Sequence, residues 1–183
     1  MTSKERVLTA MRRQVPDRVP RFLDYASFAP ELMAEFRRRT GAERPEEYFD
    51  YDLRIVSFKP TQRREGLERF LPAQMPQDAY VDWDTGNLCV RGAHRNVQQV
   101  IHPALSEAEG PADIAIHPMP DWTAPYRWAH LEGEVADLHR RGYAVIGHMS
   151  QTLFETAWKM RGFESFLMDM AGAPEMAEAL LDR

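Results

Sequence analysis

Apolar residues recur at helical spacing near the beginning of the chain and predict two helices. Thr2 and Glu5 have the spacing of a capping box, in which each side chain bonds to the backbone of the other residue. A second helix is predicted to begin at Pro30, which a first helical turn tolerates, and to end at Gly41. The apolar faces consist of Val7, Leu8 and Met11 in the first helix and Leu32, Met33 and Phe36 in the second.

Short apolar runs predict strands over 19–23, 51–58 and 143–147, and the last of these is expected to be the most deeply buried. Further helices are predicted over 128–138, 152–162, 163–170 and 173–183. The helix over 152–162 is expected to open with a second capping box, formed by Thr152 and Glu155, and to end at Gly162. Strands that alternate with helices of ten or more residues imply parallel pairing, so the chain is predicted to be an α/β protein.

Residues 79–102 interrupt this alternation. A turn that contains Gly86 separates two short apolar runs, 80–83 and 88–90, and a third run follows at 96–101. This pattern is typical of an antiparallel hairpin. We therefore expect a hairpin insertion over about 79–102, followed by a proline-rich surface loop.

Two architectures are compatible with this order of elements, an open sheet and a (β/α)₈ barrel. No glycine-rich phosphate-binding turn follows any predicted strand, which disfavours nucleotide-binding open sheets. A barrel typically needs about 250 residues. The helix predicted over 173–183 has no terminating glycine or asparagine. The choice between the two stays open at this point. In a partial (β/α)₈ TIM barrel, residues 1–183 would supply the first three to four β/α units of a single domain.

Composition limits the classes of function. A net charge of −5 gives no electrostatic footprint for nucleic acid, and the arginine-rich stretches at 12–13, 37–39 and 63–64 are interpreted as solvated helix faces. Cys89 is the single cysteine, which excludes an internal disulfide and a cysteine-based zinc cluster. The polar amino terminus is unlike a secretory signal, and no apolar run approaches the roughly 20 residues that span a bilayer. A cytoplasmic protein without membrane or nucleic-acid partners is expected.

Several segments together resemble the uroporphyrinogen decarboxylase superfamily, which includes porphyrinogen decarboxylases and corrinoid-dependent methyltransferases. The similar segments are Ser3–Leu8, Pro16–Pro20, and the run from Phe154 through Arg161–Glu164 to Asp169 and Glu175. The resemblance covers the whole chain in order, but only the first half of a family member. It implies a TIM barrel that binds a small-molecule substrate.

The decarboxylases themselves are a poor match. Two arginines that hold the substrate's carboxylates in those enzymes are replaced by Leu23 and Ser27, so the strongest anchors for a polycarboxylate are missing. An aspartate that accepts hydrogen bonds from pyrrole nitrogens aligns with Phe58 or Lys59, and a family tyrosine aligns with Trp158.

The methyltransferase branch is therefore the preferred interpretation. This resemblance implies zinc, a corrinoid and possible docking of a corrinoid protein, with the zinc ligands in the second half of the barrel. The six histidines of the chain show no ligand spacing, so no metal ligand is assigned, and the 183 residues alone are expected to be inactive. The alternatives are a porphyrinogen decarboxylase, a non-catalytic binding module that completes a barrel as a homo-oligomer, and an unrelated open sheet.

Candidate substrate-binding residues follow the predicted strands, because barrel active sites form at the carboxyl ends of the strands. They are Asp24 and Tyr25 after the first strand, Ser57 and Lys59 at the end of the second, and His148 and Ser150 after the third. Structural roles remain open for each: Asp24 can form a turn, His148 can be a core residue, and Lys59 can be solvated. Arg161 is expected to form an ion pair.

Overall fold

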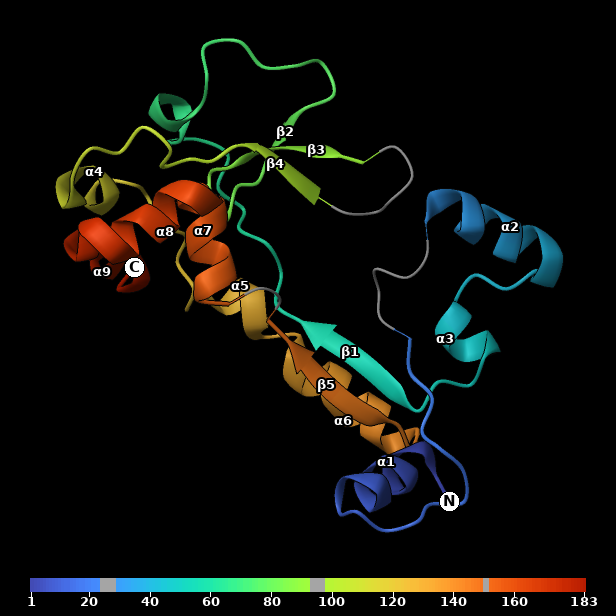
Figure 1. The fold of residues 1–183 in the computed structure, drawn as a ribbon. Coiled ribbons are helices and arrows are strands. Elements are labelled where there is room, and N and C mark those ends of the chain that lie inside the picture. The colour runs from blue at the N-terminus through green and yellow to red at the C-terminus, as the bar shows by residue number, and fades with distance from the viewer. Residues whose placement is uncertain (24–28, 93–97, 150–151) are drawn as a thin grey trace. The chain divides into compact units, whose positions relative to one another are not determined.

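The computed structural model describes residues 1–23, 29–92, 98–149 and 152–183. These residues form two compact units (Figure 1). The first unit comprises Met1–Lys59 and Ala124–Met149, and the second comprises Pro60–Gly92, Val97–Thr123 and Ser150–Arg183, in each case as far as the chain is described. Each unit has its own sheet.

The first unit contains α1 (Ser3–Met11), α2 (Pro30–Thr40), α3 (Pro45–Tyr48), β1 (Leu53–Ser57), α5 (Pro125–Trp128), α6 (Leu131–Arg140) and β5 (Ala144–His148). Strands β1 and β5 pair in parallel, from Leu53 opposite Ala144 to Ser57 opposite His148. In Figure 1, α6 runs alongside the two strands, and it contacts both of them. The predicted parallel pairing is confirmed.

Local signals in the first unit behave as predicted. Thr2 and Glu5 form the capping box at the beginning of α1, with Thr2 N–H donating to Glu5 at 2.8 Å and Glu5 N–H donating to Thr2 at 3.2 Å. Helix α2 ends at Gly41, which adopts the left-handed conformation with φ +69°. That conformation favours glycine because a side chain would be strained there.

Two predictions for the first unit are wrong. Residues 19–23, all of which the structure describes, form no strand. The backbone of Arg21 bonds instead to Asp52, donating to its carboxylate at 2.7 Å and accepting from its N–H at 2.8 Å, whereas Pro20 has no N–H to offer a ladder. Strand β5 is also less buried than expected, since Ile146 is 37% exposed. An apolar run predicts burial on both faces, which a two-stranded sheet does not provide.

A buried ion-pair network lies at the amino end of β1. The Asp52 carboxylate is fully buried and accepts hydrogen bonds from Arg6 and from Arg18, the latter at 2.7 Å. Arg6 also bonds to Asp17 at 2.6 and 2.9 Å. Burial by itself raises the pKa of Asp52, but the bonds from the Arg21 N–H and the arginine side chains outweigh it and hold the pKa below its usual value. Asp52 is therefore ionised inside the fold.

The second unit contains η2 (Glu68–Phe70), β2 (Tyr80–Val81), β3 (Leu88–Arg91), β4 (Gln98–His102), α4 (Pro111–Ala115), α7 (Phe154–Arg161), α8 (Phe163–Gly172) and α9 (Pro174–Leu181). Its strands form an antiparallel sheet in the order β2-β3-β4, as the hairpin pattern predicted. The turn between β2 and β3 requires Gly86, which has φ +80° and would place a Cβ 2.7 Å from the ring of His117.

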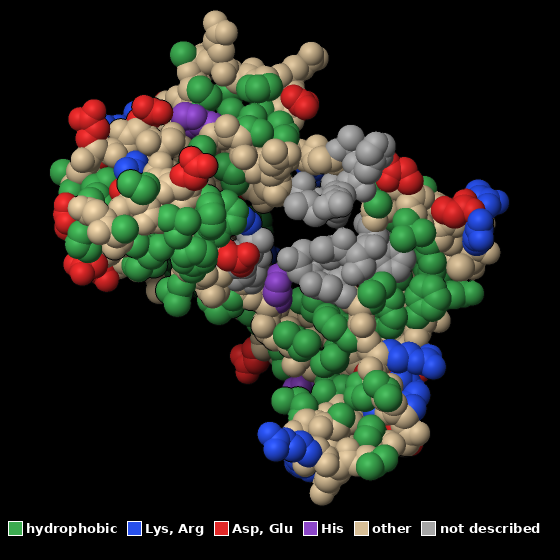
Figure 2. All heavy atoms as spheres, in the orientation of Figure 1, with side chains coloured by type: hydrophobic (Ala, Val, Ile, Leu, Met, Phe, Trp, Pro, Cys, Tyr) green, Lys and Arg blue, Asp and Glu red, His purple; other side chains and the backbone are tan. Residues whose placement is uncertain are grey.

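Helices α4, α7, α8 and α9 surround the core of the second unit. The core residues are Leu105, Ile114, Ala157, Met160, Phe166, Met176, Ala177 and Leu180. Other apolar side chains remain on the surface, and Figure 2 shows them gathered over α7 and α8, where Met168 is 70% exposed. The chain is thus a mixed α/β protein with a parallel two-stranded sheet and a separate antiparallel three-stranded sheet.

Two predictions concern arginines of the second unit; the one for Arg63 is wrong and the one for Arg161 is confirmed. Arg63 does not lie on a solvated helix, since its guanidinium donates to the carbonyls of Pro118 and Trp83. Arg161 forms the expected ion pair, with Asp169 at 2.7 Å.

The predicted second capping box is wrong. Helix α7 begins at Phe154, and its N-cap residue is Leu153, with φ +46°. No side chain of the described residues forms a capping hydrogen bond there. Its end at Gly162 is as predicted. Among the described helices, none combines the length and the apolar character needed to traverse a bilayer.

Burial of His117 makes the stability of the second unit dependent on pH. Its side chain is 1% exposed and packs edge-on against Phe70, with ring centres 4.6 Å apart. Burial lowers the pKa of His117 to about 4, and the positive charges of Arg63 and Arg183 act in the same direction.

We expect the second unit to lose about 3 kcal/mol of stability as the pH falls from about 6.5 to 4. In this range the unfolded chain binds a proton at residue 117 that the folded chain does not. The contribution of His117 to the free energy of unfolding therefore decreases as the pH falls through this range and is constant above about pH 6.5. Urea unfolding of a Trp128→Phe variant measures this, since Trp83, Trp122 and Trp158 all belong to the second unit. His117→Leu should remove the His117 contribution to the pH dependence of the free energy of unfolding. An unchanged pH dependence in this variant would exclude His117 as its origin.

Candidate functional site

The carboxyl ends of β1 and β5 bring two of the predicted site residues together. Ser57 is the last residue of β1 and lies directly opposite His148, the last residue of β5. The Ser57 side chain is exposed, and His148 is half-buried. A hydroxyl and an imidazole at adjacent strand ends can bond to one small ligand.

Lys59 lies just beyond this pair. Its backbone N–H donates to the carbonyl of Arg127 at 3.1 Å, which fixes the segment after β1, while its side chain is exposed. The ammonium group is thus available at the same end of the sheet.

His130, which the sequence analysis did not identify, also reaches this end. Its Nε2 lies 3.1 Å from the carbonyl oxygen of Ser57 and 4.0 Å from a carboxylate oxygen of Glu134. A carbonyl oxygen only accepts, so Nε2 carries the hydrogen and donates it to Ser57. Because a crossover helix starts at the carboxyl end of the strand before it, the position of His130 directly before α6 was a usable signal.

Aromatic and guanidinium groups support the segment after β1. The Arg127 guanidinium lies 4.9 Å from the centre of the Phe58 ring, and the rings of Phe58 and Trp128 are 5.2 Å apart. Arg127 is fully buried, so these contacts form a packed base beside Ser57 rather than a mobile surface. Trp128 is the one tryptophan of the first unit, which makes it a fluorescent reporter for this site.

Three predicted site residues, Asp24, Tyr25 and Ser150, lie outside the described residues. Of the six candidates, the structure therefore places Ser57, Lys59 and His148, and it places all three at one end of the β1–β5 pair.

The described residues provide no ligand group for the zinc that the family resemblance implies, whose ligands that resemblance places in the second half of the barrel. Within residues 1–23, 29–92, 98–149 and 152–183, no group of three His, Cys, Asp or Glu side chains could hold a metal ion. Cys89 is buried in β3, where burial raises the pKa of its thiol and Gln98 lies 2.9 Å from the sulfur. A protonated, buried thiol is a poor zinc ligand.

Comparison with known proteins yielded no match to a family model, to a curated protein or to a solved structure.

Proposed function

We propose that this chain forms part of a (β/α)₈ barrel of the uroporphyrinogen decarboxylase superfamily, of the corrinoid-linked methyl-transfer type. The carboxyl end of β1 and β5 would bind its small-molecule substrate. The observation that carries the proposal is the pairing of Ser57 with His148 at the ends of two parallel strands, the position at which barrel enzymes bind substrates.

The order of elements supports the barrel. Helix α6 leads from the region after β1 back to β5 and contacts both strands, which is the arrangement of a β/α unit. The segments that resemble the superfamily also have defined roles in the fold. Arg6 and Arg18 pair with Asp52, and Asp17 pairs with Arg6. Arg161 pairs with Asp169.

Methyl transfer is preferred to decarboxylation because of the residues around the site. Strand β1 is followed by Phe58 and Lys59, where the decarboxylases have an aspartate. Neither residue can accept a hydrogen bond from a pyrrole nitrogen through its side chain. Leu23 stands where those enzymes have a carboxylate-binding arginine, so a substrate with many carboxylates loses an anchor.

The side chains of this chain have defined tasks in the proposal. His148 and Ser57 would orient the ligand by hydrogen bonds, and the Lys59 ammonium would attract an anionic group such as the corrinoid phosphate. His130 would fix the end of β1 through its bond to the Ser57 carbonyl. No step is assigned to zinc, because the described residues do not provide its ligands.

Titration calorimetry with methylcobalamin tests the proposal. We expect binding by the unaltered chain and by His139→Ala, which removes an exposed histidine of α6 from the same unit. His148→Ala should weaken binding about tenfold, since it removes one hydrogen-bonding group from the site. Uroporphyrin is the competing ligand. Binding of uroporphyrin in place of methylcobalamin would favour the decarboxylase alternative, and binding of neither would overturn the assignment.

A further inference from the structure

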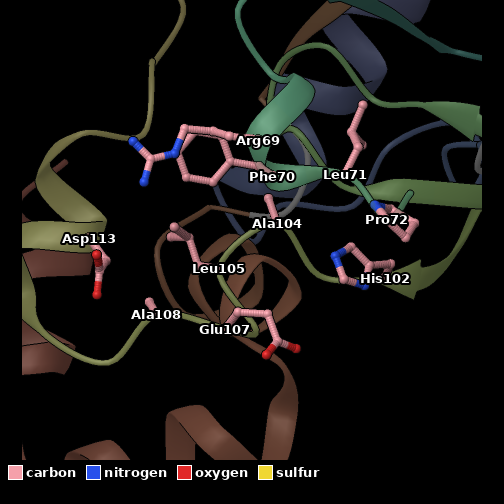
Figure 3. Close-up of a pocket in the computed structure, with 10 residues that line it drawn as sticks. All are labelled: Arg69, Phe70, Leu71, Pro72, His102, Ala104, Leu105, Glu107, Ala108 and Asp113. Atoms are coloured by element: carbon pink, nitrogen blue, oxygen red, sulfur yellow. The ribbon is translucent and has the colours of Figure 1, made fainter. Parts of the chain in front are cut away.

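A separate pocket lies entirely within the second unit, between η2, the end of β4 and the segment that precedes α4 (Figure 3). Its volume is about 320 Å³, at the lower limit for small-molecule sites, which are commonly 300–1,000 Å³. Phe70, Ala104 and Leu105 provide apolar lining, and Ala104 and Leu105 are buried. A small ligand with an aliphatic portion matches such a surface.

Charged groups of both signs line the same pocket without neutralising one another. Arg69 lies near the Phe70 ring, 5.3 Å from its centre, and makes no ion pair within the described chain. The Glu107 carboxylate is exposed and likewise has no hydrogen-bonding partner among these residues. Asp113 uses one oxygen, Oδ2, to accept from the backbone N–H groups of Glu109 and Gly110 at 2.9 and 3.2 Å, which leaves Oδ1 available.

The charged groups lie at two ends of the pocket. In Figure 3, Arg69 and Asp113 lie to the left of Leu105, whereas His102 lies to its right and Glu107 below it. One cation and two carboxylates give the lining a net charge of −1 when the imidazole is neutral. A ligand that balances the lining therefore carries a net charge of +1, with charges at both ends of an apolar body.

We propose that this pocket binds a basic α-amino acid with an unbranched aliphatic side chain, of which lysine is the simplest probe. Arg69 binds the α-carboxylate, for which its planar guanidinium is suited, and Asp113 Oδ1 accepts from the α-ammonium. The methylene groups lie over Leu105 and Ala104. Glu107 accepts from the distal ammonium, and His102 offers a second acceptor at that end.

Titration calorimetry with three related ligands tests each part of this assignment. Norleucine has the chain of lysine without the distal ammonium, and cadaverine has both amines without the carboxylate. We expect lysine to bind with a dissociation constant on the order of 10⁻⁴ M, and the other two to bind about tenfold more weakly.

Two variants assign the interactions to residues. Glu107→Gln should weaken lysine binding to the level of norleucine and leave norleucine binding unchanged. Arg69→Gln should weaken lysine binding to the level of cadaverine. The matched control is Glu109→Gln, which alters an exposed glutamate two residues from Glu107 that does not line the pocket, and it should leave all three affinities unchanged.

The ligand series on the unaltered protein does not depend on the folding of any variant. Equal affinity for lysine, norleucine and cadaverine would overturn the proposal, because charge at both ends would then not be recognised. Absence of measurable lysine binding would overturn it as well. Neither result bears on methylcobalamin binding, which concerns the first unit.

Discussion

Replacing Asp52 by alanine is expected to lower the free energy of unfolding of the first unit by about 3–5 kcal/mol. The carboxylate is fully buried and receives hydrogen bonds from Arg6, Arg18 and the backbone N–H of Arg21. Removing it leaves the Arg6 guanidinium, itself 7% exposed, with Asp17 as its one carboxylate partner among the residues that the structure describes. An uncompensated buried charge costs more than the hydrogen bonds themselves contribute.

Asp50→Ala is the matched control for this prediction. Asp50 also pairs with Arg18, at 3.0 Å, but its side chain is 68% exposed, and exposed pairs contribute about 0–1 kcal/mol. Unfolding by urea is followed in a variant in which Trp83, Trp122 and Trp158 are replaced by phenylalanine, so that Trp128 reports on the first unit alone. Equal losses for the two aspartate variants would contradict the assignment of Asp52 as the centre of the network.

Replacing Arg161 by leucine is expected to cost the second unit a comparable amount, about 3–5 kcal/mol. Its guanidinium pairs with Asp169 and also donates to the carbonyls of Leu105, Ser106 and Ala108 at 2.8, 3.2 and 2.9 Å. These bonds join the end of α7 to α8 and to the segment before α4. Leucine restores none of them and leaves the Asp169 carboxylate, 8% exposed, without its cation.

Arg161→Lys distinguishes charge from geometry at this position. A lysine keeps the attraction to Asp169 but lacks the planar set of donors that reaches three carbonyls at once. Arg161→Lys should therefore lower the free energy of unfolding by less than Arg161→Leu does, but still measurably. The measurement is urea unfolding in the Trp128→Phe background, with Arg91→Leu as a control at an exposed arginine of the same unit. If Arg161→Leu behaved like Arg91→Leu, the bonds to the carbonyls would have no role in stability.

Three features that depend only on neighbouring residues were predicted correctly from the sequence. The Thr2–Glu5 capping box and the helix end at Gly41 each require only one turn of chain, and both are present. The antiparallel hairpin around Gly86 is equally local. In each case the conformation is determined by the hydrogen-bonding groups and allowed φ values of the residues concerned.

Several predictions that depended on the identity of distant partners failed. The segment 19–23 has a strand-like pattern, but its hydrogen bonds go to Asp52, more than thirty residues away. Arg63 was interpreted as part of a solvated helix face, but its guanidinium donates to the carbonyl of Pro118. The ion pair of Arg161 was expected, whereas its three carbonyl partners, more than fifty residues earlier, were not.

The candidate site was partly predictable because a general rule about parallel sheets applies to it, and that rule does not require knowing which residues pair. Strand ends that share a direction lie at one edge, so Ser57 and His148 were expected together and are register partners. His130 was missed because the helix predicted over 128–138 included it, whereas the structure begins α6 only at Leu131. Its contact with the Ser57 carbonyl depends on how the crossover folds.

The register of β1 and β5 has a consequence for synthesis on the ribosome. Leu53 pairs with Ala144, so residues 54–143 are translated before the parallel ladder can begin to form. At about 5–20 residues per second, this delay is roughly 5–20 s. During that time the nascent chain presents β1 without its partner strand, a state that chaperones bind and that slow codons between the two strands would prolong.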